Sequence, residues 1–277
     1  MTPVIPWRNA DMCGIVGCIT KSGGAPGVLI QGLKRLEYRG YDSAGIAVIE
    51  GGSIKTVREV GKLTNLEQTL NGIQLNGRTG LGHTRWATHG RPTQINAHPH
   101  RDTSGKIVVV HNGIIENFRE LRERLQKSGH RFESDTDSEV IAHLVASHMS
   151  GNLCEAVRLA VRELDGTYAI GVLHADCPDV LIGARKDSPL IVGIGQGEVF
   201  LASDATAIID HTKQIVFLED GEIAELSRSP SPGLWRRRNA AAFRTSCSRR
   251  SMSSRSSFRM HCWAGWPKAR GKYFSRT

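Results

Sequence analysis

The sequence predicts an α+β fold in which helices and strands form separate stacked layers. Short apolar runs broken by turn residues, which are typical of strands, cluster near the start of the chain and again between residues 167 and 227. Amphipathic helical patterns are grouped between these strands. Because strands and helices do not alternate one by one, the order argues against a regular parallel βαβ arrangement.

The first elements follow from local signals. The apolar run 13–20 contains glycines and reads as a buried strand. Apolar residues then recur at helical spacing over 26–38, and Gly40 follows as a stop signal. The segments 43–50 and 53–60 are joined through two glycines, which predicts a β-hairpin.

The remaining elements are predicted by the same two periodicities. Helical spacing of apolar residues predicts helices at 63–70, 116–127, 137–149 and 154–164. Short apolar runs predict strands at 80–87, 106–113, 167–175, 179–185, 190–195, 198–203, 214–220 and 221–227. The chain of 277 residues is long enough to bury a substantial core with these elements.

The net charge of +9 comes from the end of the chain. Residues 228–277 hold eleven arginines, two lysines and no acidic residue, which leaves 23 basic against 27 acidic residues before them. Serine and arginine alternate there without an apolar stripe, so we expect a basic, disordered tail or an out-of-frame extension. The charge distribution therefore argues against a nucleic-acid partner, since only the tail is basic enough to support one.

The class of protein is narrowed further by what the chain lacks. It has no apolar run long enough to span a membrane, and its first residues lack the pattern of a secretory signal. The six cysteines are scattered and form no CxxC pair, which favours a reducing cytoplasm. Five histidines fall between His83 and His111, but ligand-spaced carboxylates and an HExxH pattern are missing. We expect no metal and no cofactor.

Cys13 is the first candidate for chemistry. In most proteins a cysteine at the start of a buried strand is an inert packed thiol. Here Met12 precedes it, and removal of a starting methionine would leave Cys13 with both a thiol and an α-amine of pKa about 8. Such a residue carries its own nucleophile and base.

Three further segments offer polar groups, each with a structural alternative. Arg85 provides a planar fork for a carboxylate, or joins a structural ion pair. Asn112 and Gly113 could supply two donors to an oxyanion, although an Asn-Gly pair after a strand is more commonly a turn. Asp137 could hold an ammonium group, or cap the helix that follows.

Six motifs in family order resemble the glutaminase domain of glucosamine-6-phosphate synthase, the glutamine:fructose-6-phosphate amidotransferase. They are MCGIVG at 12–17, LEYRGYDSAGIAV at 36–48, HTRWATHG at 83–90, NAHPH at 96–100, VVVHNGIIEN at 108–117 and TDSEVIAHL at 136–144. The resemblance covers residues 12 to 227. It implies a class II glutamine amidotransferase with the four-layer αββα sandwich of N-terminal-nucleophile hydrolases.

The resemblance also implies site residues. Cys13 matches the nucleophile that forms a γ-glutamyl thioester and releases ammonia, and Asn112 and Gly113 match the oxyanion hole. Substrate binding is implied for a second group, with Arg85 on the glutamine carboxylate and Asp137 on its ammonium group. The others in that group are Trp86, Thr88 and His89; the tryptophan moves in family members to gate ammonia.

Two departures from the family shape the remaining expectations. Residues 1–12 form an N-terminal extension, which we interpret as a misassigned start in preference to a propeptide, because Met12 directly before the cysteine fits a start codon. If the extension stays attached, the α-amine of Cys13 becomes an amide. The domain is expected over 13–227, followed by the tail 228–277, without the sugar-phosphate isomerase half. Fructose 6-phosphate would then be reached only through that half. A possible homodimer, and a catalytically silent remnant that docks on an intact synthase, remain alternatives.

Overall fold

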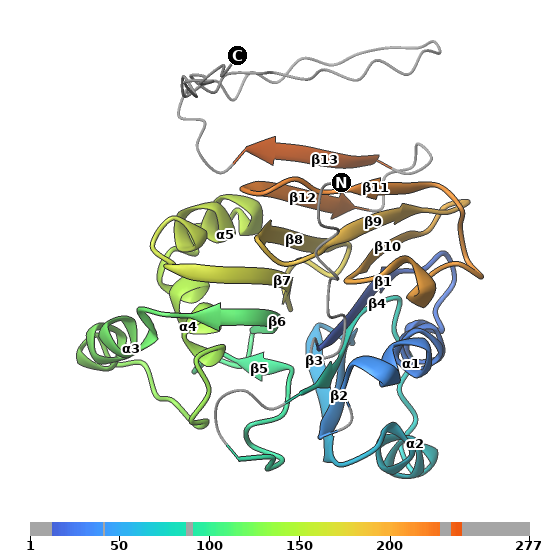
Figure 1. The fold of residues 1–277 in the computed structure, drawn as a ribbon, viewed down its shortest axis with the longest axis horizontal. Coiled ribbons are helices and arrows are strands. Elements are labelled where there is room, and N and C mark those ends of the chain that lie inside the picture. The colour runs from blue at the N-terminus through green and yellow to red at the C-terminus, as the bar shows by residue number, and fades with distance from the viewer. Residues whose placement is uncertain (1–12, 41, 87–90, 228–233, 240–277) are drawn as a thin grey trace, which may run out of the picture. The chain divides into compact units, whose positions relative to one another are not determined.

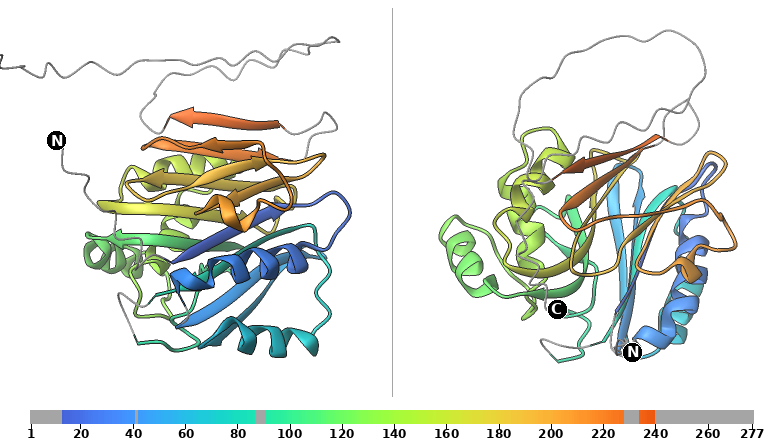
Figure 2. Two further views of the ribbon diagram at one scale, coloured as in Figure 1. Left: turned by 45° about the vertical axis from the view of Figure 1, so that its right-hand side comes forward. Right: turned by 45° about the horizontal axis from the view of Figure 1, so that its top comes forward.

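The computed structural model describes residues 13–40, 42–86, 91–227 and 234–239, the last range as backbone only. Two antiparallel sheets lie face to face, with helices on the outer face of each (Figure 1). This is the four-layer αββα arrangement that the family resemblance implied. The right-hand view of Figure 2 shows the two sheets edge-on between their helices.

The first sheet has seven strands, and β1 and β4 lie near its centre. Its order is β11 (Ile215–Phe217), β9 (Ile191–Ile194), β10 (Val199–Ala202), β1 (Gly14–Ile19), β4 (Thr79–Arg85), β2 (Ser43–Glu50) and β3 (Ser53–Val60). The predicted hairpin is confirmed, since β2 and β3 pair from Ser43 with Val60 to Glu50 with Ser53.

The second sheet has six strands, with β6 and β7 carrying its longest pairing. Its order is β13 (Leu234–Asn239), β12 (Glu222–Ser227), β8 (Val180–Lys186), β7 (Gly166–His174), β6 (Ile107–Ile115) and β5 (His100–Arg101). The two-residue strand β5 carried no apolar pattern in the sequence. It exists because the backbone of His100 and Arg101 pairs with Val109 and Val108 of β6.

The helices cover the outer faces of the two sheets. Helices α1 (Ala25–Leu36) and α2 (Leu63–Asn71) lie against the first sheet, and α3 (Phe118–Lys127), α4 (Glu139–Ser147) and α5 (Leu153–Val161) belong to the side of the second (Figure 1). Short 3-10 turns, η1 (Glu37–Arg39) and η2 (Ala205–Ala207), follow α1 and β10. The sequence predicted each of the five α-helices in the described ranges.

Burial on both faces explains why the central strands are apolar throughout. On β1, Ile15 packs into the core between the sheets, and its neighbour Val16 packs against the α1 side. Successive side chains of a strand point to opposite faces, so a strand covered on both sides needs apolar residues at nearly every position. Leu81 and Leu181 meet in the same inter-sheet core from opposite sheets.

The end of the chain differs from the expectation. We expected all of 228–277 to lack order, whereas residues 234–239 form β13, which pairs with β12 from Ser227–Leu234 to Glu222–Asn239. Backbone hydrogen bonding to an open sheet edge requires no apolar pattern, so this strand leaves no signal in the residues. The rest of that segment and residues 1–12 lie outside the described residues.

A search of the described ranges for a helix long and apolar enough to cross a membrane found none.

Candidate active site

Cys13 lies directly before β1, at one end of the first sheet. Gly14 pairs with Thr84 of β4, so the next residues outward, Cys13 and Arg85, come together. The backbone N–H of Trp86 donates a hydrogen bond to the Cys13 Sγ at 3.0 Å. The half-buried thiol is therefore held by the peptide that follows β4, and the strand register explains why HTRWATHG lies beside the cysteine.

Gly40 makes room for this contact. A Cβ at residue 40 would lie 2.7 Å from the carbonyl carbon of Arg85 and 2.9 Å from the backbone nitrogen of Trp86. Both neighbours are backbone atoms, which cannot move aside as a flexible side chain could. The glycine of the EYRGYDSAG motif thus permits the Trp86 N–H to reach the sulfur, a role that sequence reasoning did not find.

Asn112 approaches the same cysteine from the second sheet. Its side-chain Nδ2 donates to the Cys13 carbonyl oxygen at 2.7 Å. The strand β6 continues through Asn112 and Gly113, which pair with Ala169 and Tyr168 of β7. The interpretation of Asn-Gly as a turn is therefore wrong. The side-chain amide of Asn112 reaches Cys13 from inside the strand β6.

Gly113 has a conformation that only glycine adopts readily. Its φ is 130°, and a Cβ there would lie 2.1 Å from the Thr167 carbonyl oxygen. Both the backbone angle and the close approach of β7 exclude a side chain. The Asn-Gly pair is thus required by the path of β6 beside the cysteine.

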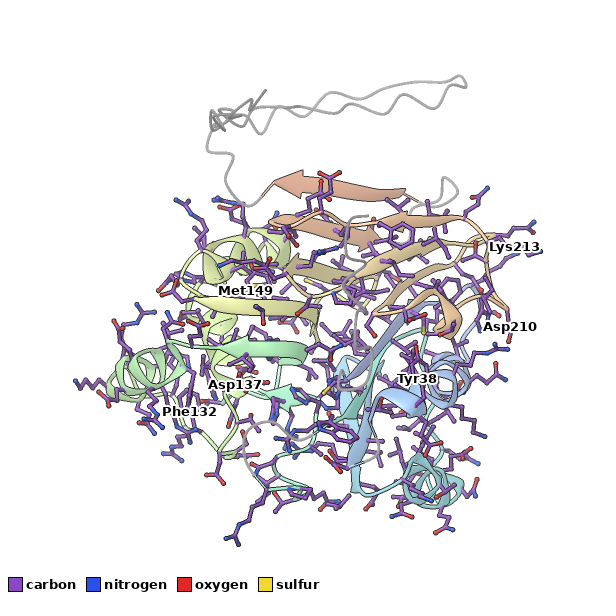
Figure 3. The ribbon with its side chains drawn as sticks, in the orientation of Figure 1. Tyr38, Phe132, Asp137, Met149, Asp210 and Lys213 are labelled. Atoms are coloured by element: carbon purple, nitrogen blue, oxygen red, sulfur yellow. The ribbon has the colours of Figure 1, made fainter. Side chains whose placement is uncertain are left out.

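Asp137 lies between β6 and the start of α4, as Figure 3 shows. Its Oδ2 accepts a hydrogen bond at 2.8 Å from the backbone N–H of Ile115, two residues after Gly113. The capping alternative is wrong, because Ser138 occupies the N-cap position and no side chain caps the helix. The buried carboxylate is instead tied to the end of β6.

Glu139 anchors the loop that carries Asp137. Its Oε1 accepts from the backbone N–H of Glu133 at 2.8 Å, and its Oε2 accepts from the backbone N–H and the hydroxyl of Ser134, both at 2.7 Å. These bonds, with that from His143, lower the pKa of Glu139 to about 2 against the cost of burial. The sequence showed this residue only as part of a helical motif.

Charges around the thiol oppose one another. Burial raises the pKa of Cys13, and the hydrogen bond from Trp86 and the charge of Arg85 counter that rise in part. Burial likewise lowers the pKa of Arg85, whose guanidinium feels the opposite charges of Cys13, Asp137 and Asp42. A thiol whose pKa is raised needs a proton acceptor beside it to react near neutral pH.

Six of the residues predicted for the site lie near one another in the structure. Cys13, Arg85, Trp86, Asn112, Gly113 and Asp137 gather around the ends of β1, β4 and β6. Thr88 and His89 lie outside the described residues. Within the described ranges no three histidine, cysteine or acidic side chains converge as a metal-binding group.

The segment that carries Arg85, Asn112, Gly113 and Asp137 matches a known domain family. Residues 56–229 match the family described as the glutamine amidotransferase domain. The chain belongs to this family.

Curated relatives place the amidotransferase domain within longer proteins. This chain is 55% identical over 219 residues to glutamine--fructose-6-phosphate aminotransferase [isomerizing] of Pyrococcus horikoshii. The aligned region covers 78% of this chain and 36% of the relative. The protein of the same name from Aquifex aeolicus is 53% identical over 216 residues, with the same two shares. The chain thus spans about a third of the length of these relatives.

Solved structures support the fold of the amidotransferase domain. The glutamine phosphoribosylpyrophosphate amidotransferase of B. subtilis superimposes with a TM-score of 0.70 at 24% identity, covering 83% of this chain and 49% of that one. A class-II glutamine aminotransferase domain protein from Silicibacter pomeroyi is covered completely, with a TM-score of 0.55 at 15% identity. At these identities the likeness concerns the fold.

Buried histidines in the amidotransferase domain predict a loss of stability in acid. Burial lowers the pKa of His83 and of His100 to about 3, and it lowers the pKa of His98 well below 6.5. The unfolded chain, with histidine pKa values near 6.5, therefore binds more protons between about pH 6.5 and 3. Each buried histidine should lower the free energy of unfolding by on the order of 1 kcal/mol per pH unit as the pH falls. Glu139 adds to the loss below about pH 4.5.

Urea unfolding at constant ionic strength, repeated from pH 7.5 to 4.5, measures this dependence. We expect the midpoint to fall steadily below about pH 6.5. A midpoint that stays constant down to pH 4.5 would show that these histidines are not buried in the neutral form.

Proposed function

We propose that residues 13–227 form a glutaminase that hydrolyses L-glutamine to glutamate and ammonia, with Cys13 as the nucleophile. The Cys13 sulfur attacks the side-chain carbonyl carbon of glutamine. The negative charge that develops on the carbonyl oxygen is stabilised by the Asn112 amide and the Gly113 N–H. The carbon–nitrogen bond then breaks, and the amine leaves as ammonia.

The thiol must lose its proton in this step, which requires a base beside the sulfur. Because the pKa of Cys13 is raised by burial, its proton must be accepted as the sulfur attacks. The α-amine of Cys13, when this residue is the first of the chain, takes the proton and returns it to the leaving nitrogen. A water then attacks the thioester, regenerates the thiol and releases glutamate.

The two ends of the substrate find complementary groups. Arg85 is 4% exposed and presents a guanidinium suited to the glutamine α-carboxylate. Asp137, held by the Ile115 N–H, accepts the α-ammonium group. We assign Thr88 and His89 to carboxylate binding and Trp86 to control of ammonia passage on the strength of the family motif alone.

The observation that carries the proposal is the meeting of two sheets at Cys13. The first sheet supplies the Trp86 N–H to its sulfur, and the second supplies the Asn112 amide to its carbonyl. The test is to incubate the protein beginning at Cys13 with L-glutamine and to quantify glutamate and ammonia. We expect equal amounts of both products and none from D-glutamine; absence of product from L-glutamine would overturn the proposal.

Replacing Arg85 and Asn112 should affect different kinetic constants. In Arg85→Lys a point charge replaces a two-pronged donor, so the KM for glutamine should rise far more than kcat falls. In Asn112→Ala an oxyanion donor is lost, at a cost of roughly 3 kcal/mol, so kcat should fall on the order of a hundredfold. Steady-state kinetics separate the two. An unchanged kcat in Asn112→Ala would exclude the amide from the oxyanion hole.

The names of the relatives suggest where the ammonia goes. We propose that it serves amination of fructose 6-phosphate to glucosamine 6-phosphate, a step that needs the remaining two thirds of the relatives' length. A cytoplasmic location fits the free cysteines of the described residues. A homodimer stays a prediction. The silent-remnant alternative is not favoured, because every residue of the proposed site is present.

A further inference from the structure

His83 lies on β4 behind the proposed oxyanion hole and is 1% exposed. Its Nε2 is 2.9 Å from the Asn112 Oδ1 and 3.1 Å from the carbonyl oxygen of His111. No role was assigned to this residue by the sequence or by the proposed mechanism. It is nevertheless the side chain that holds the oxygen end of the Asn112 amide.

The hydrogen-bond partners define which protons are present. Both oxygens near His83 Nε2 are acceptors, so this nitrogen must carry a proton and donate to them. A reversed Asn112 amide would place its oxygen 2.7 Å from the Cys13 carbonyl oxygen, with no proton between them. The amide nitrogen must therefore face Cys13, and the His83 N–H stabilises that orientation.

We propose that His83 is a positioning residue that orients the Asn112 amide, so that its N–H groups and not its oxygen face the carbonyl under attack. The inference rests on the proposed function. Without the His83 donor the amide is free to reverse, and the reversed amide presents a partial negative charge to the developing oxyanion. His83 thus acts through Asn112 and does not touch the substrate.

The surroundings of His83 keep it neutral. Burial, Arg85 and His111 lower the pKa of His83 to about 3, although the bonds to Asn112 and His111 favour its charged form. The ring of His98 lies 4.1 Å away, centroid to centroid, and burial lowers the pKa of His98 as well. A neutral imidazole with one proton has one donor, and that donor is committed to the two oxygens.

Two substitutions of matched length separate the donor from the bulk. In His83→Gln the amide nitrogen can occupy the place of Nε2 and donate, whereas His83→Met fills a similar space with no donor. In chains beginning at Cys13, we expect His83→Met to lower kcat by about ten- to a hundredfold with the KM for glutamine within about threefold. We expect His83→Gln to keep most of the activity. Equal losses in both variants, or a normal kcat in His83→Met, would overturn the proposal.

A double-mutant cycle tests whether His83 acts through Asn112. In the Asn112→Ala background, His83→Met should cause almost no further fall in kcat, because the amide it orients is gone. Multiplicative losses would show that the residues act independently and would overturn the proposal.

A measurement on the full chain separates this inference from the proposed function. Nitrogen-15 NMR of labelled histidine should show His83 neutral and protonated at Nε2 from pH 7.5 to 5, whatever the activity. A proton at Nδ1, or a charged ring in that range, would overturn the positioning role even if glutamine is hydrolysed. Conversely, the expected tautomer in a chain beginning at Cys13 that releases no glutamate would contradict the proposed function alone.

Discussion

Cys13→Ala should abolish glutamine hydrolysis in a chain that begins at Cys13. The thiol is the proposed nucleophile, and loss of a nucleophile typically lowers kcat by at least about 10⁴-fold. Cys13 is the described cysteine that both accepts the Trp86 N–H and has its carbonyl bound by Asn112. Release of glutamate, followed with an enzyme-coupled assay, measures the effect.

Cys18→Ala is the matched control, five residues further along the chain on β1. Cys18 is fully buried, and burial raises its pKa far above the ordinary range. Its thiol donates a long hydrogen bond of 4.0 Å to the Ala25 carbonyl oxygen. We expect kcat within about twofold of the unchanged protein, since only packing is altered. Equal losses from the two substitutions would contradict Cys13 as the nucleophile.

Residues 1–12 should suppress hydrolysis as long as they are attached. A peptide bond between Met12 and Cys13 converts the amine of pKa about 8 into an amide that cannot accept the thiol proton. Since burial already raises the pKa of Cys13, the sulfur then lacks the base it needs. We expect the full chain to show little or no release of ammonia and the chain 13–277 to be active.

A chain with a single alanine added before Cys13 distinguishes the amine from the length of the extension. It should be nearly as inactive as the full chain, because one peptide bond is enough to remove the base. Mass spectrometry must verify that each N-terminus is intact. Full activity from a chain whose residues 1–12 are verifiably present would refute the role of the terminal amine.

Local patterns were sufficient for most of the elements. The helices α1, α2, α3 and α5 each bury one apolar face, so their spacing is visible in the residues themselves. Helix α4 is buried on nearly all sides, from Glu139 to Val145, and is visible as a dense apolar run. The strands β1 and β6 are buried on both faces and read as short continuous apolar runs. The strands β5 and β13 were missed because they depend on hydrogen bonds to a neighbouring strand, which leave no pattern in their own side chains.

At the site, too, some features were predictable from the sequence and others depend on contacts between strands. The order of its motifs pointed to Cys13, Arg85, Asn112 and Asp137, because each belongs to a short motif that matches the family. The dipeptide Asn-Gly by itself favoured a turn, and only the pairing of Gly113 with Tyr168 placed it inside a strand. Asp137 had two possible roles from its motif, and the structure excludes the cap, because Ser138 occupies the N-cap and the Asp137 carboxylate accepts from Ile115.

By itself, the sequence determined the kinds of residues at the site, the covered faces of its helices and the layered class of the fold. These depend on composition and on spacing along a single element. The tertiary structure alone decided that Trp86, Gly40 and His83 serve Cys13 and Asn112 through a backbone N–H, an absent Cβ and a buried imidazole. Such contacts join residues from different strands, and their geometry is set only when the two sheets pack together.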